Sequence, residues 1–432
     1  MFSVDWFYFV YPKGQSSLIV MVFSFNEGAG VIATLRAAET RAGSGFSRQA
    51  EIIAKLRQGF AVASRSGWRG FDPYDGLLSP IVRLPVVGRS RSFRLVLTQV
   101  VKRSPVNLRP VLGIKEGLNP KALALLLSAA ARTGEGSELR PYVQPLAAAL
   151  EESQSAFHPG MSWGYNFPWQ GRSFYLPAGT PTVVVTSFAG EAFLDAHAAT
   201  GVGRYLENAQ ESCDFVLRGL NRTRDSTGTC LSYSPLDRSV VYNASLLGAR
   251  LLLLTGQRAG RKDLIREASP LVAYALAKQR PDGAWMYGEA RNQQWVDSFH
   301  TGFILRALNA YRRITNDERT GEAVRKGGAF YSSSFFGSAG EPYFGLGKKY
   351  PLDIHSAAEG ILTFLELRDV EATCEAQAAA VGRWMISNLL DEHGLFHYQV
   401  RRTYLAKIPF MRWSQAWGIR ALAELVRCGI EL

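Results

Sequence analysis

The chain has 432 residues, of which 47% are hydrophobic and 20% are charged, and its formal net charge is +12. This is the composition of an ordinary globular protein with an ample core. The positive charge indicates an acidic partner, such as an anionic sugar, a phosphate, a nucleic acid or a membrane surface. The cysteines form no CxxC pair, which argues against a disulfide framework and a zinc site (Cys213, Cys230, Cys374 and Cys428).

Residues 1–45 are expected to form a poorly defined N-terminal extension, followed by a single domain over 46–432. The apolar run Leu18–Phe25 is too short to span a bilayer, which takes about 20 residues. The basic start and small-residue cleavage site of a secretory signal are missing, and Met21 is an alternative start. These features predict a cytoplasmic protein, with peripheral attachment to the inner membrane left open.

From residue 46 onward, helices with one polar face alternate with helices that are apolar nearly all round. Gly203–Gly219 is of the first kind and Val240–Thr255 of the second, and a helix of the second kind is usually buried on both sides. The alternation predicts six or seven helical hairpins. Their outer and inner helices are expected near 46–66/74–87, 91–103/117–133, 138–157/182–200, 204–221/240–255, 262–280/296–315, 317–337/353–367 and 370–390/412–430.

We therefore predict an all-α fold in which the hairpins close into an α/α toroid. An open solenoid would repeat in the same way, but the uniformly apolar, small-residue-rich inner helices favour the closed ring. The long aromatic loops all run from an outer to an inner helix, whereas the inner-to-outer connections are short. Residues of the long loops and of the first turns of the inner helices should thus converge on one cavity.

The first long loops carry acidic and basic candidates. Tyr74 and Asp75 open the first predicted inner helix and are candidate catalytic residues, with a turn or cap as the alternative for Asp75. The segment Arg83–Lys115 holds eight Lys and Arg and no acidic residue. Four basic side chains are candidate ligands for a uronate carboxylate or a lipid pyrophosphate, unless they form only a solvated face (Lys102, Arg103 and Arg109, with Arg412 from the last long loop). Nucleic acid is not expected, because no known binding module is visible.

Large aromatic residues recur in the long loops. Their rings could stack on the C–H faces of sugars, line a hydrocarbon pocket, or simply pack between hairpins. Trp163 and Trp169 share a longer loop with His158 and are expected to be freer than Trp285. The candidate substrate-binding aromatics are Trp163, Tyr165, Trp169, Trp285, Tyr287 and Tyr343.

Two neighbouring inner helices each begin with an Asp and a His. Asp297 and His300 are three residues apart on one helix face, and Asp353, His355 and Glu359 open the next inner helix. Such groups could act as general acid and base, with the carboxylates raising the imidazole pKa. The alternative is that each Asp only caps its helix. Two Asp–His pairs at equivalent repeat positions favour a site.

Common cofactor and nucleophile motifs are missing in a suitable context. The chain shows no GxGxxG, GxxxxGK[ST], HExxH or GxSxG that argues for a dinucleotide, P-loop, zincin or α/β-hydrolase site. We therefore expect neither a cofactor nor a metal.

The segment Gln279–Trp285 (QRPDGAW) resembles the QxxxGxW element of the squalene-hopene cyclase and prenyltransferase toroids. In that family the element ties an outer helix to the next inner helix, so the resemblance implies a toroid. The DxDD acid motif of the cyclases is not matched, because Asp353–Ser356 lacks paired carboxylates, which disfavours proton-initiated cyclisation. The cysteine-histidine zinc pattern of lanthipeptide cyclases and prenyltransferases is also absent.

Three further segments resemble bacterial proteins found with capsule and exopolysaccharide synthesis. They are Gly70–Leu77, Trp295–Gly302 and Pro351–Glu359. Those proteins are related to the toroid domain of glucuronyl C5-epimerases and to six-hairpin glycosidases. The resemblance implies a carbohydrate context and assigns no catalytic residue.

Taken with the charge, these features predict a protein that acts on or binds an acidic bacterial polysaccharide or its lipid-linked precursor. Epimerase or lyase chemistry would use His or Tyr to remove the proton beside a uronate carboxylate, and hydrolysis would need two carboxylates flanking the bond. The basic chain and the His and Tyr of the rim favour the first. A terpenoid or prenyl-chain enzyme and a non-catalytic glycan-binding assembly protein are the alternatives, and the oligomeric state is open.

Overall fold

The computed structural model describes residues 48–432 apart from 85–87, 89, 135, 157–158 and 172–174. The expected extension 1–45 and His158 lie outside the described residues. Within the described part helices dominate and strands are short, which confirms the all-α prediction. No helix in these ranges is both long and apolar enough to cross a membrane.

The inner helices form a closed ring. Each packs against the next one along the chain, and the last packs against the first. Because their apolar residues point to both sides, these helices are buried almost along their whole length. In chain order they are α3 (Pro120–Arg132), α5 (Val183–Thr200), α7 (Tyr242–Ala259), α9 (Ser298–Thr315), α11 (Ile354–Leu367) and α13 (Ala416–Arg427).

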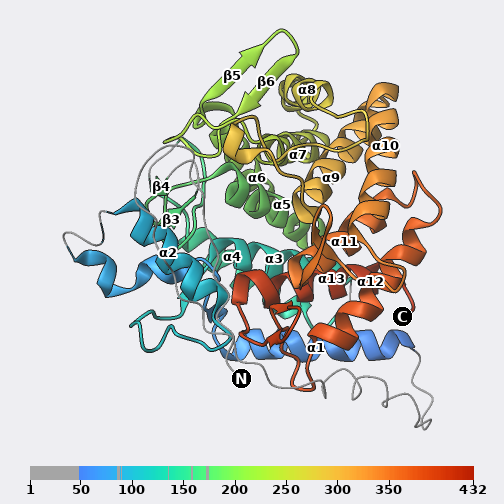
Figure 1. The fold of residues 1–432 in the computed structure, drawn as a ribbon. Coiled ribbons are helices and arrows are strands. Elements are labelled where there is room, and N and C mark those ends of the chain that lie inside the picture. Colours follow the sequence, from blue (N-terminus) through green and yellow to red (C-terminus); the bar gives the residue numbers. More distant parts are fainter. Residues whose placement is uncertain (1–47, 85–87, 89, 135, 157–158, 172–174) are drawn as a thin grey trace. The chain divides into compact units, whose positions relative to one another are not determined.

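The outer helices each pack against the inner helix that precedes them around the ring. The N-terminal α1 completes this pattern by packing against α13 (Figure 1), and the Gln49 side-chain amide donates a hydrogen bond to the Val426 carbonyl (3.3 Å). The outer helices are α1 (Arg48–Arg65), α4 (Val143–Glu152), α6 (Gly203–Arg218), α8 (Lys262–Ala277), α10 (Glu318–Phe335) and α12 (Cys374–Leu389).

The described residues therefore form six hairpins, and the expected hairpin 46–66/74–87 is wrong in its second half. Over 74–84, the described part of that region, the helical segments are the short 3-10 helices Asp75–Leu78 and Pro80–Arg83, because proline and glycine interrupt it. The helix α2 (Arg91–Arg103) packs against the first of these turns, not on the ring. It belongs to the long loop that joins α1 to α3.

The two ends of the ring differ, as predicted. Short connections join inner to outer helices and include the left-handed residues Gly201, Gly260 and Asn316, which end α5, α7 and α9. The outer-to-inner loops are long and carry the strands, which the sequence analysis did not predict. These are β1 (Arg69–Gly70), β2 (Gly117–Leu118), β3 (Trp169–Gln170), β4 (Tyr175–Leu176), β5 (Arg222–Asp225), β6 (Gly228–Leu231), β7 (Tyr343–Gly345), β8 (Lys348–Asp353), β9 (Gln399–Val400) and β10 (Leu405–Ala406).

Most strand pairs lie within one long loop, and one pair, β8 with β9, joins two of the loops at this end. All pairs are antiparallel, and the strands of the last two long loops form one sheet in the order β10-β9-β8-β7. The strand β1 pairs with β2 inside the first long loop. The loop end is thus an ordered surface on which side chains can be held in place.

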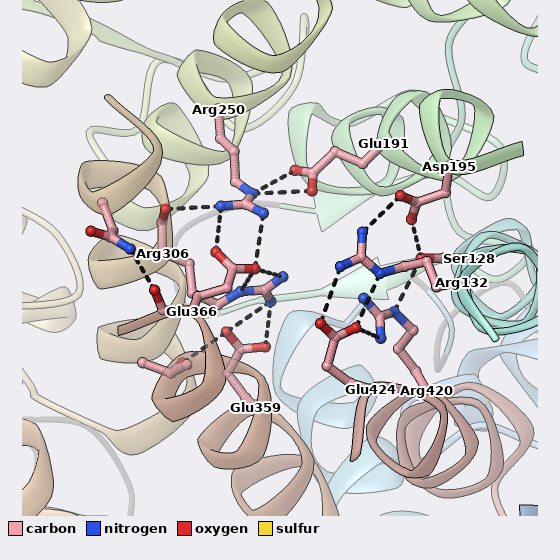
Figure 2. A network of polar contacts seen from close by, with 12 residues as sticks. Ser128, Arg132, Glu191, Asp195, Arg250, Arg306, Glu359, Glu366, Arg420 and Glu424 are labelled. Carbon is pink, nitrogen blue, oxygen red and sulfur yellow. Dashed lines mark hydrogen bonds and ion pairs between the residues drawn. The ribbon is translucent and has the colours of Figure 1, made fainter. Parts of the chain in front are cut away.

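The interior of the ring contains two clusters of ion pairs to which all six inner helices contribute (Figure 2). In the first cluster, Arg250 pairs with Glu191 (3.0 Å) and with Glu366 (2.8 Å). Arg306 pairs with the same Glu366 (2.9 Å) and with Glu359 (3.0 Å).

The second cluster is centred on Glu424. This carboxylate pairs with Arg132 (3.0 Å) and Arg420 (2.7 Å), while Arg132 also reaches Asp195 (2.9 Å). Arg420 donates a further hydrogen bond to the Ser128 hydroxyl (3.0 Å). Arg132 and Glu424 belong to the last turns of their helices, so this cluster lies toward the plain end of the ring, opposite the long loops.

Candidate functional site

Two tryptophans expected to bind substrate are instead buried and act as fasteners, by which we mean that each ties its long loop to an outer helix. The Trp285 indole N–H donates to the Ala275 carbonyl in the last turn of α8 (2.9 Å), and the Trp163 indole N–H donates to the Leu150 carbonyl in α4 (2.7 Å). Their exposed fractions are 1% and 0%. Each carbonyl lies in the last turn of its helix and also accepts a backbone N–H of the capping residue, Ser153 or Lys278. The expectation that Trp163 is free to contact a ligand is therefore wrong.

The rest of the QxxxGxW element joins neighbouring outer helices. The Gln279 amide donates to the Gly283 carbonyl (3.1 Å) and to the Ala323 carbonyl of α10 (3.0 Å). Gly283 has a left-handed backbone (φ +94°), and a Cβ there would lie 2.6 Å from the Lys326 carbonyl oxygen. The element thus ties α8 to the next outer helix, whereas the resemblance implied a tie to the next inner helix.

The acidic and basic residues of the first long loop form buried ion pairs, one of which connects this loop to the last long loop. Asp75 accepts two hydrogen bonds from Arg109 (2.8 and 3.0 Å), and Asp72 is held by Arg412 of the last long loop (2.6 and 2.7 Å). Burial raises the pKa of Asp75 to about 7, although the Arg109 charge opposes this. These four residues are at most 4% exposed, and the Arg412 guanidinium also lies over the Tyr165 ring (5.0 Å).

Asp297 and His300 form a hydrogen-bonded pair at the start of α9. Asp297 caps the helix by accepting the His300 backbone N–H (3.1 Å) and also holds the His300 ring nitrogen Nδ1 (2.7 Å). The Trp295 indole N–H donates to the same carboxylate (2.9 Å). The carboxylate is 3% exposed, whereas the imidazole side chain is 22% exposed. With Nδ1 bound to Asp297, Nε2 is the nitrogen left for a ligand.

The second Asp–His pair is built differently. Asp353 also caps its helix (2.8 Å to the His355 N–H), but its oxygens bind Trp413 (3.0 Å) and Gln399, and it is fully buried. Burial raises the pKa of Asp353. His355 makes no contact with this carboxylate through its ring, and both ring nitrogens are buried without a hydrogen-bond partner. The two pairs were expected to be equivalent. Both aspartates cap their helices, but only Asp297 binds the ring of its histidine.

The two imidazoles nevertheless lie close together. His300 and His355 both contact the Phe299 ring, with centroid distances of 4.2 and 4.3 Å. Glu359, one turn further along α11 than His355, is bound by Arg306 in the first ionic cluster. Burial raises the pKa of Glu359 to about 7, against the opposing charge of Arg306. Because the Phe299 ring contacts both imidazoles, His300 and His355 are neighbours of the same side chain.

Tyr287 contacts His300, and aromatic residues of two other long loops contact one another at the same end of the ring. Tyr287 lies 4.6 Å from the His300 ring, and Tyr165 and Trp169 contact Tyr233 (3.5 Å between the hydroxyls, and 5.4 Å between centroids). Tyr287, Tyr165 and Trp169 are half-buried. Burial raises the pKa of Tyr287, and the charge of Asp297 raises it further. These phenols are thus protonated donors at neutral pH.

Tyr74 and Lys102 belong to the same group of side chains. The Lys102 ammonium bonds to the Tyr74 hydroxyl (2.5 Å), and the Tyr74 ring lies 5.5 Å from Trp413. Two other candidates lie elsewhere. Arg103 has an exposed side chain, and the Tyr343 hydroxyl is directed at Gly337, just after α10.

A cleft of about 450 Å³ lies beside Tyr287, between the loops that precede α7 and α9. It is lined by Leu236, Asp237, Arg238, Ser239, Val240, Glu289, Ala290 and Gln293. The charge of Asp237 is near enough to contribute to the raised pKa of Tyr287. Among the described residues, no three of His, Cys, Asp and Glu gather where they could hold a metal ion.

Lys121 is an interior residue that the sequence analysis missed. It stands in the first turn of α3, is 2% exposed, and its ammonium lies over the Phe188 ring at 4.0 Å. A lysine in the otherwise apolar run Lys121–Ala131 (KALALLLSAAA) was the available signal. The ionic clusters were missed too, because their charges come from helices far apart in sequence.

No protein-family model matches the chain, and no curated protein matches it. Solved structures do resemble it. The structure of an unsaturated glucuronyl hydrolase specific for heparin aligns with a TM-score of 0.59 at 11% identity, over 89% of this chain and 99% of that one. A sugar epimerase from a ruminal bacterium aligns with a TM-score of 0.57 at 11% identity, over 74% and 91%.

The GH76 α-mannanase BT2949 of Bacteroides thetaiotaomicron aligns with a TM-score of 0.55 at 13% identity, over 72% of this chain and 86% of that one. Identities this low speak to the fold and not to the reaction. The chain therefore has the α/α toroid fold that these proteins share.

Proposed function

We propose that the chain is an enzyme that acts on an acidic polysaccharide or its lipid-linked precursor, by proton transfer at a uronate. The observation that carries this proposal is the Asp297–His300 pair. It presents a partly exposed imidazole at the loop end of the ring, held from behind by a buried carboxylate. Such an imidazole is the usual general base and acid of enzymes near neutral pH.

In this reaction, His300 Nε2 takes the proton from the carbon beside the uronate carboxylate. The C–H electron pair moves into the carboxylate, giving an enediolate. Reprotonation from the opposite face by a second acid gives the epimer. In elimination, the bond to the neighbouring glycosidic oxygen breaks, this oxygen takes the proton held by His300, and an unsaturated sugar is left. Asp297 holds the Nδ1–H and stabilises the imidazolium that forms, as a carboxylate does in other His–Asp pairs.

Hydrolysis is less well supported by the geometry. It requires two carboxyl groups that flank the scissile bond. Asp75, Asp353 and Glu359 are each engaged by buried Arg, Trp or Gln side chains and are at most 3% exposed. Asp297 remains, and it is committed to His300 and Trp295.

The surroundings suit a sugar chain. Tyr74, Tyr165, Trp169 and Tyr287 are half-buried aromatic residues whose rings suit stacking on sugar C–H faces, and the tyrosine hydroxyls can donate to sugar hydroxyls. The cleft beside Tyr287 has the volume of a ligand site. The heparin-specific glucuronyl hydrolase and the sugar epimerase show that this fold carries uronate and epimerase chemistry elsewhere.

The test is hydrogen exchange in D2O, followed by NMR on uronate-containing polysaccharides. The wild type should incorporate deuterium at the carbon beside the carboxylate, and His300→Ala should slow this by about 10² to 10⁴. His393→Ala is the matched control, since this histidine is exposed on the last long loop.

Wild-type protein that exchanges no deuterium into any tested uronate would contradict the proposal. A glycan-binding assembly protein would then be indicated if sugar binding persists and depends on Tyr165 and Trp169. Turnover of a prenyl substrate would indicate the terpenoid alternative.

A further inference from the structure

Lys121 is a buried basic residue without a counter-ion. Every other buried Lys or Arg of the described residues is an arginine that faces a carboxylate (Arg109, Arg250, Arg306, Arg412 and Arg420). Lys121 makes no ion pair, and its ammonium lies instead among the rings of Phe188 (4.0 Å), Trp417 (5.3 Å) and Phe303 (5.4 Å). An uncompensated buried ammonium is costly, so a protein that keeps one has a use for it.

His355 lies in the same aromatic chamber, which we define as Phe188, Phe299, Phe303, Trp413 and Trp417. Its ring is stacked between Phe299 (4.3 Å) and Trp417 (4.2 Å), with Trp413 at its edge (4.7 Å). Both ring nitrogens are unpartnered, although the residue is only 2% exposed. Buried polar atoms are nearly always hydrogen-bonded, so two open nitrogens beside an open ammonium indicate an absent ligand.

We propose that Lys121 and His355 bind the carboxylate of the sugar on which His300 acts. This inference rests on the proposed function and names the part of the substrate that the chamber receives. A carboxylate needs one cation and one further donor, which is what the chamber offers, whereas a phosphate dianion is usually held by several donors. Phe299, which lines the chamber, contacts both His300 and His355, so the chamber adjoins the acid–base group.

The charges around Lys121 make this binding depend on pH. Burial lowers the pKa of Lys121 well below its usual range, and Arg412 lowers it further. The nearby carboxylates of Glu359 and Asp72 oppose this, but each is already bound to an arginine. Burial also lowers the pKa of His355, with Lys121, Arg412 and His300 adding to the effect. An arriving carboxylate therefore favours uptake of a proton by the amine.

The first experiment compares D-glucuronate with its neutral analogue D-glucuronamide by titration calorimetry. Wild type should bind glucuronate at least about tenfold more tightly, since a charge-assisted bond is worth that much or more. Lys121→Met should remove this preference and leave glucuronamide binding unchanged. Lys55→Met, the same change on the outer helix α1, should keep it.

The variant should also fold, because methionine has a similar length and removes an unpaired amine from an apolar chamber. A thermal unfolding midpoint equal to or above that of wild type is expected. A preference for glucuronate that survives in Lys121→Met would overturn the inference.

A second measurement needs only wild type. Glucuronate binding at alkaline pH, titrated in buffers of different ionisation enthalpy, should show proton uptake, and the affinity should fall as pH rises. Glucuronamide should show neither effect. Equal binding of the two ligands would overturn the inference and leave the proposed function standing. If wild type prefers glucuronate but exchanges no deuterium, the proposed reaction would be overturned and the carboxylate-binding role of Lys121 and His355 would stand.

Discussion

At the scale of single residues, the Asp297 carboxylate has two roles in its pair with His300. Asp297 caps α9 through the His300 backbone N–H, and it orients the His300 ring through Nδ1. The sequence left both roles open, because an aspartate before a helix predicts a cap whatever else it does. The structure adds the ring contact, which a cap does not need.

Asp297→Asn should distinguish the two roles. Asparagine caps helices about as well as aspartate, so the unfolding free energy should change by less than about 1 kcal/mol. Activity should fall strongly, by about 10⁴ in a comparable His–Asp pair, because the amide neither fixes the tautomer nor stabilises the imidazolium. Denaturant unfolding and deuterium exchange on one preparation would measure both. Equal activity would mean that Asp297 is only a cap.

At the scale of elements, tryptophans in long loops fasten those loops to the outer helices. Trp163 and Trp285 use the same bond from the indole to a carbonyl near a helix C-terminus. Trp169, six residues after Trp163, lies in β3, is half-buried, and contacts Tyr165 and Tyr233. Helices and loop lengths could be predicted from periodicity. Which tryptophans tie a loop to a helix and which stay available for a ligand could not be predicted, because the carbonyl partner lies in another element.

Trp163→Phe should therefore destabilise the fold by about 2 kcal/mol, through the lost hydrogen bond and the space left by the smaller ring. Trp169→Phe should cost much less stability and weaken sugar binding instead. Urea unfolding and calorimetry of both variants would measure this. Reversed effects of the two substitutions would contradict the assignment of Trp163 as a fastener.

At the scale of the whole described ring, stability depends on charges that no local pattern reveals. The sequence predicts inner helices that are apolar nearly all round, and this pattern does not reveal the two ionic clusters (Figure 2). Arg250 pairs with Glu366, which follows it by 116 positions. Arg132 pairs with Glu424, which follows it by 292 positions. Such pairs meet only when the ring closes, so they could not be predicted from spacing.

Glu424→Gln should destabilise the ring by about 3 to 5 kcal/mol, because it leaves Arg132 and Arg420 without their shared buried carboxylate. Glu138→Gln is the matched control, since its pair with Arg57 is exposed and should be worth less than about 1 kcal/mol. Chemical unfolding of both variants tests this. Similar small losses in the two variants would show that the cluster contributes little.

The first cluster should also govern stability in acid. Burial alone would raise the pKa of Glu366, but Arg250 and Arg306 lower it from 4.5 to about 2. Because the folded-state pKa is depressed, its stabilisation is complete above about pH 4.5 and is lost as pH falls toward 2, about 3 kcal/mol in all. Glu366→Gln should be less stable at pH 6 and lose less between pH 4.5 and 3. Parallel acid curves for both proteins would contradict this.

The contact of α1 with α13 has a consequence for how the gene could be rearranged. Gln49 bonds to Val426 across the two ends of the described domain, so α13 and α1 meet like any other inner and outer pair. A circular permutant that links Leu432 to Arg48 by a short flexible linker and opens between Gly201 and Val202 should fold to the same ring. Its circular dichroism and unfolding transition should match those of residues 48–432 in the original order.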